Sequence, residues 1–374
     1  MASFQKTVAS YQQGARTMPG EYYTSPDILA EEKETIFARH WNLAGRVTRL
    51  DRPGDYMLRT IAGESIIIVR SRDGKLRAFF NVCRHRGTRI CREETGHFSE
   101  TIQCPYHAWT YSTDGRLIGA PHMNEVEGFD KAEFPLHQAS LAEWEGFIFV
   151  HIGAEPQPFD QWLAPLRDRF ARFNLPNLKV GHSVTYDVHA NWKLVFQNYS
   201  ECLHCPAIHP ELATVLPYQS GANDLTAGPF LGGYMEIKAP NQSATLSGRA
   251  CGRLVNPALT ADDRQRAFYY SIMPNMLLSM QPDYVNYYIL TPLSVDRTQV
   301  ESEWLFHPDN EQNPDFNPQD AIGFWDVTNR QDWDIVSRSQ LGLGSRRYAP
   351  SPYSPRESVP AAWDREYLRM MGRV

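Results

Sequence analysis

Two short Cys/His pairs place the strongest constraint on how this chain folds. Cys83 and His85 form a Cys-x-His pair, and after an interval of eighteen residues Cys104 and His107 form a Cys-x-x-His pair. Thiolates and imidazoles are the ligands that proteins use for zinc and for some iron–sulfur clusters. Because four such donors lie on two short segments, we expect this region to hold two loops against each other around a metal centre.

The mixed composition of each pair distinguishes between two kinds of metal centre. Zinc fingers usually place both cysteines in one short pair and both histidines in the other, whereas each pair here contains one of each. In a Rieske [2Fe–2S] cluster two cysteines hold one iron and two histidines hold the other, which raises the reduction potential. We therefore expect Cys83, His85, Cys104 and His107 to bind a Rieske cluster, with structural zinc as the alternative.

A second candidate metal site lies further along the chain. Glu201, His204 and His209 form a Glu-x-x-His-x-x-x-x-His motif. We expect a helix over 192–205, on which Glu201 and His204 share a face, and we expect Pro206 to end or kink it so that His209 turns back. Two histidines and one carboxylate hold non-haem Fe(II) with open positions for O₂. Ordinary histidines at a helix end are the alternative.

Helical periodicity identifies a carboxylate for this second site. Residues 319–341 have the period of a helix, and at about 100° per residue Asp332 falls near the centre of its inward-facing stripe, whereas Asp326 and Asp334 project from other faces. A buried carboxylate is costly unless it is paired or bound to metal. We therefore expect Asp332 to be the third ligand, with a buried structural ion pair as the alternative.

Glu201 remains as a carboxylate beside a ligating histidine. Such a residue can accept the ring N–H of the ligand and fix its tautomer. We hypothesise that Glu201 joins a cluster histidine to His204 and forms the electron path between the two centres. Because two sites within one subunit can lie far apart, we expect this bridge to cross a subunit boundary.

Composition excludes several other classes of protein. The chain has 374 residues, of which 42% are hydrophobic and 21% charged, so a sizeable core is expected. A net charge of −6 argues against nucleic-acid binding. The chain has no run of eighteen apolar residues, and its first six residues lack an apolar signal core. We therefore expect a cytoplasmic protein with no membrane segment.

The four cysteines outside the Cys/His pairs belong to no comparable metal-binding motif. In a reducing compartment a disulfide framework is not expected, and buried free thiols are the simplest interpretation. The cysteines concerned are Cys91, Cys202, Cys205 and Cys251.

The hydrophobic pattern predicts an α+β fold. We expect a helix from Pro26 to about Trp41, antiparallel strands in both halves of the chain, and an extended arm over the last thirty residues. The domains expected are an N-terminal helical segment over 1–40 that packs on the catalytic domain, a β-rich Rieske domain over 41–155 and a catalytic iron domain over 156–374. The predicted strands cover 55–61, 64–71, 75–80, 146–152, 180–190, 268–272, 276–280, 283–290 and 299–306.

With both motifs in place, the chain resembles the α-subunits of Rieske non-haem iron oxygenases over nearly its full length. The resemblance implies a Rieske domain beside a helix-grip (START-like) catalytic domain, and a homotrimer in which the cluster of one subunit feeds the iron of its neighbour through an acidic residue. The matching segments are 83–87, 104–109, 191–193, 201–209 and 332–340.

One departure from the family narrows the resemblance. Ring-hydroxylating dioxygenases usually have aspartate where this chain has Glu201, and residues 198–205 look more like the carnitine, glycine betaine and proline betaine oxygenases. Those members hydroxylate a C–H bond next to a quaternary nitrogen, which leads to C–N cleavage or N-demethylation. An aromatic-ring hydroxylase is the alternative within the family, and a pure electron-transfer Rieske protein is the alternative outside it.

Substrate and partner expectations follow from this resemblance. A quaternary ammonium group binds to aromatic faces, although core packing is the commoner role of strand aromatics, and at most about half of those on a strand can face a cavity. The chain has no G-x-G-x-x-G motif after a strand, so we expect a separate NAD(P)H-dependent reductase. The candidate pocket aromatics are Phe268, Tyr269, Tyr270, Tyr284, Tyr287, Tyr288 and Trp304.

Overall fold

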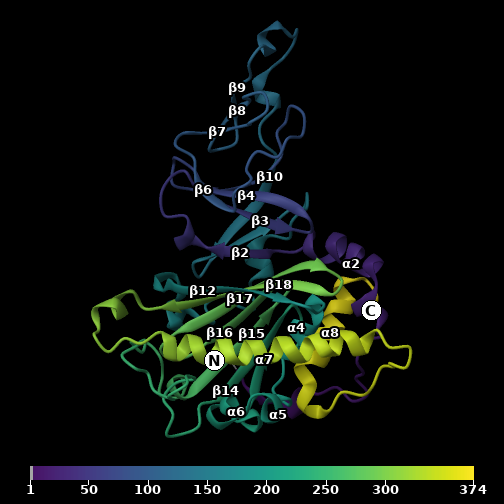
Figure 1. Ribbon diagram of the computed structural model, residues 1–374, viewed down its shortest axis with the longest axis vertical. Coiled ribbons are helices and arrows are strands. Elements are labelled where there is room, and N and C mark those ends of the chain that lie inside the picture. The colour runs from purple at the N-terminus through teal and green to yellow at the C-terminus, as the bar shows by residue number, and fades with distance from the viewer. Residues whose placement is uncertain (1–2) are drawn as a thin grey trace. The chain divides into compact units, whose positions relative to one another are not determined.

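The computed structural model describes residues 3–374, which form two compact units (Figure 1). The smaller unit covers residues 36–162, and the larger unit combines residues 3–35 with 163–374. The larger unit is therefore built from both ends of the chain. The functional domain boundaries expected after residues 40 and 155 stay a prediction.

The smaller unit is an antiparallel β-structure. A seven-stranded sheet has the order β2-β11-β10-β5-β4-β3-β6, and a separate three-stranded sheet has the order β7-β8-β9. Strand β4 is buried on both faces: Ile67 and Val69 pack in the core that contains Cys83 and Cys104, while Ile66 and Ile68 pack in a second core. The strands are β2 (Asn42–Arg46), β3 (Asp55–Ile61), β4 (Glu64–Arg70), β5 (Leu76–Phe80), β6 (Thr95–His97), β7 (Thr101–Gln103), β8 (Thr110–Ser112), β9 (Leu117–Gly119), β10 (Gln138–Trp144) and β11 (Phe147–His151), and helix α3 spans Phe159–Trp162.

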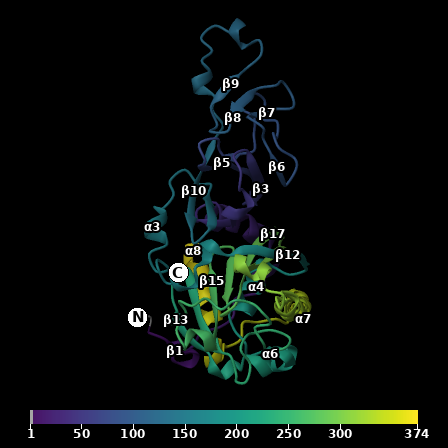
Figure 2. The same ribbon diagram turned by 90° about the vertical axis from the view of Figure 1, so that its left-hand side faces the viewer.

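An eight-stranded antiparallel sheet organises the larger unit. Its order is β1-β13-β14-β15-β16-β17-β18-β12, and the long helix α7 (Gln319–Leu343) runs across it, as the end-on view in Figure 2 also shows. Ala321, Phe324 and Trp325 of this helix pack on Trp304 and Phe306 of the sheet. The strands are β1 (Gln5–Lys6), β12 (Lys179–Val188), β13 (Ala222–Leu225), β14 (Phe230–Glu236), β15 (Arg266–Ile272), β16 (Met276–Met280), β17 (Val285–Ser294) and β18 (Arg297–Phe306).

The observed strands confirm the predicted α+β class, and 55–61 and 276–280 occur with the predicted bounds. The helix predicted from Pro26 is also present as α2 (Pro26–Glu32), but its π-helical continuation ends at Phe37 rather than near Trp41. The other helices of the larger unit are α1 (Glu21–Thr24), α4 (Trp192–Tyr199), α5 (Cys205–Ile208), α6 (Pro210–Val215) and α8 (Ser358–Met370).

The C-terminal prediction was wrong. Residues 358–370 form helix α8, whose Trp363 and Tyr367 are fully buried, rather than an extended arm. The 3-10 helix Pro355–Glu357, which leads directly into α8, begins with a capping box, in which the Ser354 and Glu357 side chains bond each other's backbone. This pattern satisfies amide groups that a helix start leaves without partners. The proline and serine that we took for an arm are helix-start signals.

A buried ion pair joins the N-terminal segment to the rest of the larger unit. Lys193 Nζ, at the start of α4, lies 2.5 Å from Glu32 Oε1 of α2, and both side chains are buried. Glu32 also accepts hydrogen bonds from Trp192 Nε1 at 2.7 Å and Tyr367 Oη at 2.6 Å. Asn191 caps α4 through the Lys193 N–H. The Asn191-Trp192-Lys193 segment thus fixes the beginning of the helix that leads to the second motif.

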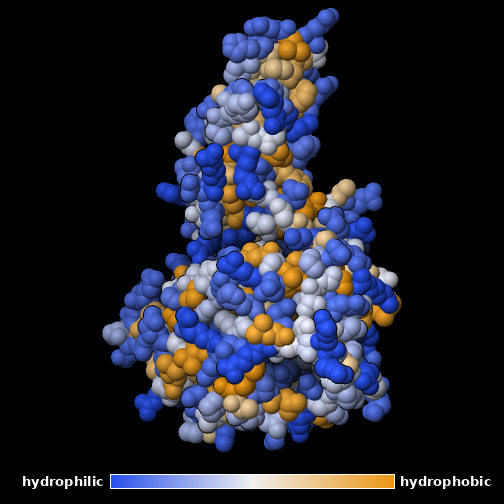
Figure 3. All heavy atoms as spheres, turned by 45° about the vertical axis from the view of Figure 1, so that its right-hand side comes forward, coloured by the Kyte–Doolittle hydropathy of each residue, from blue (hydrophilic) through white to orange (hydrophobic). Residues whose placement is uncertain are grey.

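The surface has no large continuous apolar face in the view of Figure 3, where hydrophobic side chains form small groups among hydrophilic ones. The most exposed large apolar side chain that is described is Leu341, at 81%. Within residues 3–374, no helix has the length and apolar character needed to cross a membrane.

Candidate metal centres

Two loops of the same backbone design present the predicted cluster residues in the smaller unit. In the first loop the Cys83 N–H donates to Thr88 O at 2.9 Å and the Gly87 N–H donates to Cys83 O at 3.1 Å. Gly87 is left-handed, with φ +71°. The second loop has the same two hydrogen bonds: the Ala108 N–H donates to Cys104 O at 3.2 Å, and the Cys104 N–H donates to Trp109 O at 2.8 Å. Ala108, four residues after its cysteine as Gly87 is, is also left-handed, with φ +56°.

The cysteines and histidines of these loops differ in exposure. Cys83 and Cys104 are each 3% exposed, whereas His85 is exposed and His107 half-buried. The two imidazole rings lie with their centroids 4.8 Å apart, and His85 stacks on Trp109 at the same separation. Buried sulfurs with outward imidazoles fit a Rieske cluster, in which one iron is held by each kind of ligand.

Tyr111 supports the first cysteine. Its hydroxyl lies 3.4 Å from Cys83 Sγ and accepts a hydrogen bond from the Arg84 N–H at 3.1 Å. Hydrogen bonds to cluster sulfurs tune the reduction potential. Sequence reasoning missed Tyr111, although its position on β8, directly after the second loop, is a usable signal.

In the larger unit, the three predicted iron ligands converge. Asp332 Oδ1 lies 2.8 Å from His209 Nε2 and 3.3 Å from His204 Nε2. The His209 side chain is 1% exposed, and those of His204 and Asp332 are 19% and 15% exposed. Two imidazole nitrogens and one carboxylate oxygen that share a point are the donor set of a facial non-haem iron site. These residues therefore fit such a metal ion.

The outer nitrogen of each histidine has its own acceptor. His204 Nδ1 donates to Glu201 Oε1 at 2.5 Å, and His209 Nδ1 donates to Gln331 Oε1 at 2.7 Å. With the proton held at Nδ1, each Nε2 would offer its lone pair to a metal at the shared point when a metal is bound. Acceptors of this kind orient metal-binding histidines and fix their tautomer.

The charges around the site favour a cation. Burial alone lowers the pKa of His204, but the hydrogen bonds that it donates to Asp332 and Glu201 raise it to about 10. Burial also raises the pKa of Asp332, yet the bonds from His204 and His209 bring it below its ordinary value. Without a metal, the site thus keeps a carboxylate anion and takes up a proton as its compensating charge.

Asn198 and Gln331 are site residues that sequence reasoning missed. Asn198 Nδ2 donates to Asp332 Oδ1 at 3.0 Å and lies 3.4 Å from His204 Nε2. The sequence signal that could have identified Gln331 as a site residue is its position beside Asp332 on α7. The signal for Asn198 is its position one helical turn before Glu201.

The local structure around Glu201 differs from the prediction. Helix α4 ends at Tyr199, so Glu201 and His204 lie in a loop rather than on one helix face. Ser200 Oγ donates to Phe196 O at 2.6 Å, and Glu201 Oε2 accepts from the Leu203 N–H. These side-chain bonds replace the helical pattern.

Pro206 also has a different role from the one predicted. It lies in the first turn of α5 (Cys205–Ile208), where a missing N–H costs nothing, and so it starts a helix rather than ending one. His209 follows directly as the residue between α5 and α6. The short helix α5 therefore reverses the chain between His204 and His209 and brings the two histidines together.

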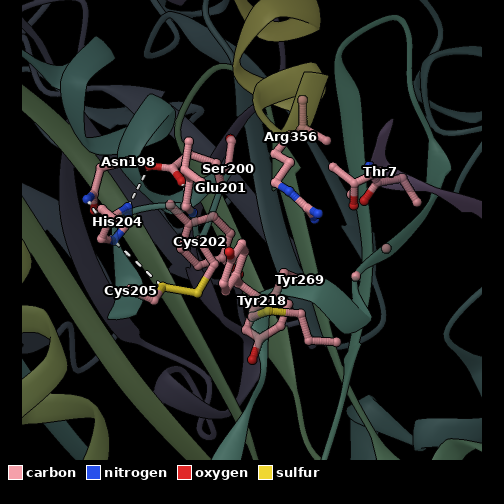
Figure 4. Close-up of a pocket in the computed structure, with 18 of the residues that line it drawn as sticks. Thr7, Asn198, Ser200, Glu201, Cys202, His204, Cys205, Tyr218, Tyr269 and Arg356 are labelled. Atoms are coloured by element: carbon pink, nitrogen blue, oxygen red, sulfur yellow. Dashed lines mark hydrogen bonds and ion pairs between the residues drawn. A yellow bond between two sulfur atoms is a disulfide. The ribbon is translucent and has the colours of Figure 1, made fainter. Parts of the chain in front are cut away.

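The expectation of free thiols was wrong for two cysteines. Cys202 and Cys205 form a disulfide that brackets Leu203 and His204 (Figure 4). Cys205 Sγ lies 3.9 Å from His204 Nε2, but as part of a disulfide it offers no thiolate to a metal. Cys91 is a buried free thiol, as predicted.

A cavity of about 150 Å³ opens beside the three converging residues. Tyr199, Tyr269 and Trp325 line it and meet edge to face, with centroids 6.2 and 6.3 Å apart. Tyr199 Oη bonds Ser279 Oγ at 2.7 Å and Trp325 Nε1 donates to Tyr284 Oη at 2.6 Å, so the polar atoms of these two rings are engaged away from the cavity. Of the seven strand aromatics proposed from sequence, Tyr269 lines this cavity; the others described here are core residues.

Comparison with protein families agrees with both centres. Residues 40–130 match the Rieske [2Fe–2S] domain, and residues 175–373 match the catalytic domain of the ring-hydroxylating α-subunit. The chain belongs to the Rieske oxygenase α-subunit family. It is therefore an oxidoreductase, and its two domains imply a Rieske cluster and a mononuclear non-haem iron that uses O₂.

Individual relatives narrow the position within this family. The chain is 31% identical to the glycine betaine monooxygenase oxygenase subunit of Chromohalobacter salexigens, over 92% of this chain and 83% of that one. It is 37% identical to the carnitine monooxygenase oxygenase subunit of Escherichia coli, over 53% of each chain.

Solved structures show the same fold. A quaternary ammonium Rieske monooxygenase in complex with L-carnitine superposes with a TM-score of 0.77 at 25% identity, and the match covers 95% of both chains. Naphthalene 1,2-dioxygenase from Rhodococcus sp. superposes with a TM-score of 0.78 at 18% identity, over 98% of this chain and 96% of that one. The fold is thus common to enzymes with dissimilar substrates.

Proposed function

We propose that the protein hydroxylates a C–H bond of a small quaternary ammonium compound, so that a C–N bond is cleaved or a methyl group is lost. The observation that carries this proposal is the cavity beside His204, His209 and Asp332, which is lined by the aromatic side chains of Tyr199, Tyr269 and Trp325. Cation–π contacts of a methylated ammonium with such rings contribute about 0.5–2 kcal/mol each. The similarity to glycine betaine and carnitine monooxygenase subunits supports the same substrate class.

In this proposal His204, His209 and Asp332 hold the mononuclear iron, and Cys83, His85, Cys104 and His107 hold the cluster. When bound, the iron activates O₂ with electrons from the cluster. Glu201 and Gln331 keep each Nε2 directed at the metal. Asn198 holds the carboxylate of Asp332 in place by its 3.0 Å hydrogen bond. The aromatic walls exclude water and hold the substrate methyl groups at the open side of the site.

Glu201 is the proposed electron bridge. Its side chain is 14% exposed, and the adjoining Leu203 is 39% exposed, so this loop reaches the surface of the larger unit. We infer that a cluster histidine of a neighbouring subunit docks there in a homotrimer. A related structure is reported as giving insights into inter-subunit electron transfer in its own enzyme. A separate NAD(P)H-dependent reductase refills the cluster.

Substrate-dependent O₂ uptake tests the proposal. The holoenzyme with a surrogate reductase should consume O₂ with betaines and release formaldehyde if demethylation occurs. Turnover of arenes to ring-hydroxylated products with no response to betaines would replace the proposal with the aromatic-ring hydroxylase. A colourless protein that contains zinc would exclude both.

A further inference from the structure

The cavity beside the iron site carries opposite charges on opposite sides. Asp332 and Glu201 are its acidic residues, and Lys6 and Arg356 also line it. In Figure 4 Arg356 and Thr7 lie on the other side of the drawn residues from Asn198 and His204, and the Arg356 side chain runs downward between Glu201 and Thr7. A ligand that spans the cavity therefore meets carboxylates at one end and a guanidinium at the other.

The basic side is built by segments from the two ends of the chain. Strand β1 pairs with β13 in a register that sets Lys6 opposite Ala222. The 3-10 helix Thr7–Ser10 is tied to the start of α8, because Ser358 Oγ donates to Thr7 O at 2.7 Å. Arg356 lies two residues before Ser358, in the 3-10 helix Pro355–Glu357. Hydrogen bonding and strand pairing thus fix the backbone segment from which the Arg356 side chain extends.

The guanidinium on the basic side has no polar partner in the part of the chain that is described. Arg356 is exposed, and its guanidinium makes no hydrogen bond or ion pair within residues 3–374. It lies over the ring of Tyr218, with its central carbon 5.5 Å from the ring centroid. A ligand that brings acceptor oxygens into the cavity can therefore pair with free donors of Arg356.

We infer that Arg356 binds the carboxylate of a zwitterionic substrate whose quaternary ammonium group lies between the aromatic walls near the iron site. This inference rests on the proposed function and adds a second recognition point to it. Guanidinium pairs with carboxylate through two parallel hydrogen bonds, which lysine cannot reproduce. Substrates that lack the carboxylate lose this contact and keep the cation–π contacts.

The test compares acids with their methyl esters. Trimethylammonium carboxylates with one to three methylene groups between nitrogen and carboxylate are assayed by O₂ uptake with the holoenzyme and a surrogate reductase. Arg356→Gln should raise KM for the best acid by about tenfold to a hundredfold with little change in kcat, which is the pattern of lost uniform binding. KM for the ester should not change. Arg356→Lys should recover only part of the loss for the acid.

A matched arginine provides the control for net charge. Arg346 is exposed, follows α7 and does not line the cavity. Arg346→Gln removes the same charge from the same unit and should leave KM for acid and ester unchanged. An equal effect of both substitutions on KM would show that the total surface charge, rather than a contact with Arg356, attracts the acid. It would overturn the assignment of Arg356.

Calorimetric binding to the anaerobic holoenzyme separates this inference from the proposed function. If the wild type binds acids about tenfold more tightly than esters, and Arg356→Gln removes the difference, the carboxylate site stands even if no quaternary ammonium compound is oxidised. If acid and ester bind equally, or Arg356→Gln weakens both equally, the inference is overturned even when O₂ uptake supports the proposed function.

Discussion

In the smaller unit the proposed cluster ligands come from residues 83–107, whereas in the larger unit the proposed iron ligands come from His204, His209 and Asp332. The cluster loops hold their shape through backbone hydrogen bonds between neighbours, and each loop repeats the other. The iron site depends on side chains instead, since Glu201 and Gln331 orient its histidines from different elements. Local turns thus hold the proposed cluster ligands in place. The proposed iron ligands are held in place by the long-range packing of α7 against the segment after α4.

The largest effect is expected from removal of the one proposed ligand that comes from α7. Asp332→Ala should abolish turnover, by about a thousandfold or more, because the histidines keep their places but lose the shared carboxylate. Iron content should fall from about three to about two per chain, with the visible spectrum of the cluster unchanged. Asp334→Ala is the control, because Asp334 is exposed on the same helix and pairs with Arg338. Full iron content in Asp332→Ala would show that the larger unit does not use this residue.

Glu201→Gln tests the link between the two centres. The amide oxygen can still accept from His204 Nδ1, so both metals should remain, while turnover falls by about a hundredfold or more because the anionic bridge is gone. Single-turnover oxidation of the cluster measures this step directly. Glu211→Gln, at an exposed site on α6, should behave like the wild type. Activity of Glu201→Gln near that of the wild type would eliminate the bridge.

Gln331→Leu tests whether side chains, rather than backbone, orient the iron ligands. It removes the acceptor from His209 Nδ1 and should weaken iron binding by about tenfold to a hundredfold. Gln331→Glu, which keeps an acceptor, should retain iron. Both variants should show an unaltered cluster spectrum, and the measurement is iron retained against a chelator. Equal retention in wild type and Gln331→Leu would mean that the packing of α5 alone fixes His209.

A smaller effect is expected at the cluster, where one side chain supplements the backbone. Tyr111→Phe removes the hydroxyl 3.4 Å from Cys83 Sγ, so the reduced cluster loses stabilisation. The potential should fall by about 60 mV, the equivalent of one net hydrogen bond of about 1.4 kcal/mol in a one-electron couple. Protein-film voltammetry measures this, and iron binding in the larger unit should not respond. An unchanged potential would show that backbone geometry sets it.

The last test concerns the pH dependence of folding stability and a buried carboxylate of α8. Burial raises the pKa of Asp364 to about 7, although hydrogen bonds from Gln197 of α4 and from Tyr353 oppose this. Since the unfolded pKa is near 4, the folded state binds the proton more tightly, and this contribution, on the order of 2–4 kcal/mol, is present below pH 4 and lost as pH rises to about 7. Asp364→Asn should flatten this part of the profile in chemical denaturation between pH 5 and 8. An unchanged slope would assign the pH dependence to other groups.

The sequence predicted which residues lie together in each centre better than it predicted the local structure around them, and their binding of metal stays a prediction. The Cys/His pairs are adjacent in sequence, so their chemistry is visible there. Helical phase predicts that Asp332 faces the two histidines, and the structure places it beside them because α7 is long and regular. The loop after α4 was not found, since Ser200 and Glu201 end the helix through side-chain hydrogen bonds that periodicity does not reveal.

Contacts between distant segments account for the other differences. Gln331 became a site residue only when α7 packed beside His209, and Arg356 entered the cavity only because both chain ends meet there. Among the strand aromatics, the pattern could not choose between core and cavity faces, and Tyr269 alone of the proposed seven lines the cavity. The Ser354–Glu357 capping box is a helix-start signal within the segment that we expected to be an extended arm.

The buried pair of Glu32 and Lys193 has a practical consequence for anyone who designs an expression fragment. A segment that begins where the catalytic family match begins, at residue 175, retains Lys193 but discards Glu32, the buried carboxylate 2.5 Å from it. Removal of one partner of a buried ion pair costs about 3–5 kcal/mol, and the charge left behind would lie at the head of α4. A stable catalytic fragment must therefore carry residues from the beginning of the chain as well, supplied either by fusion or as a second polypeptide.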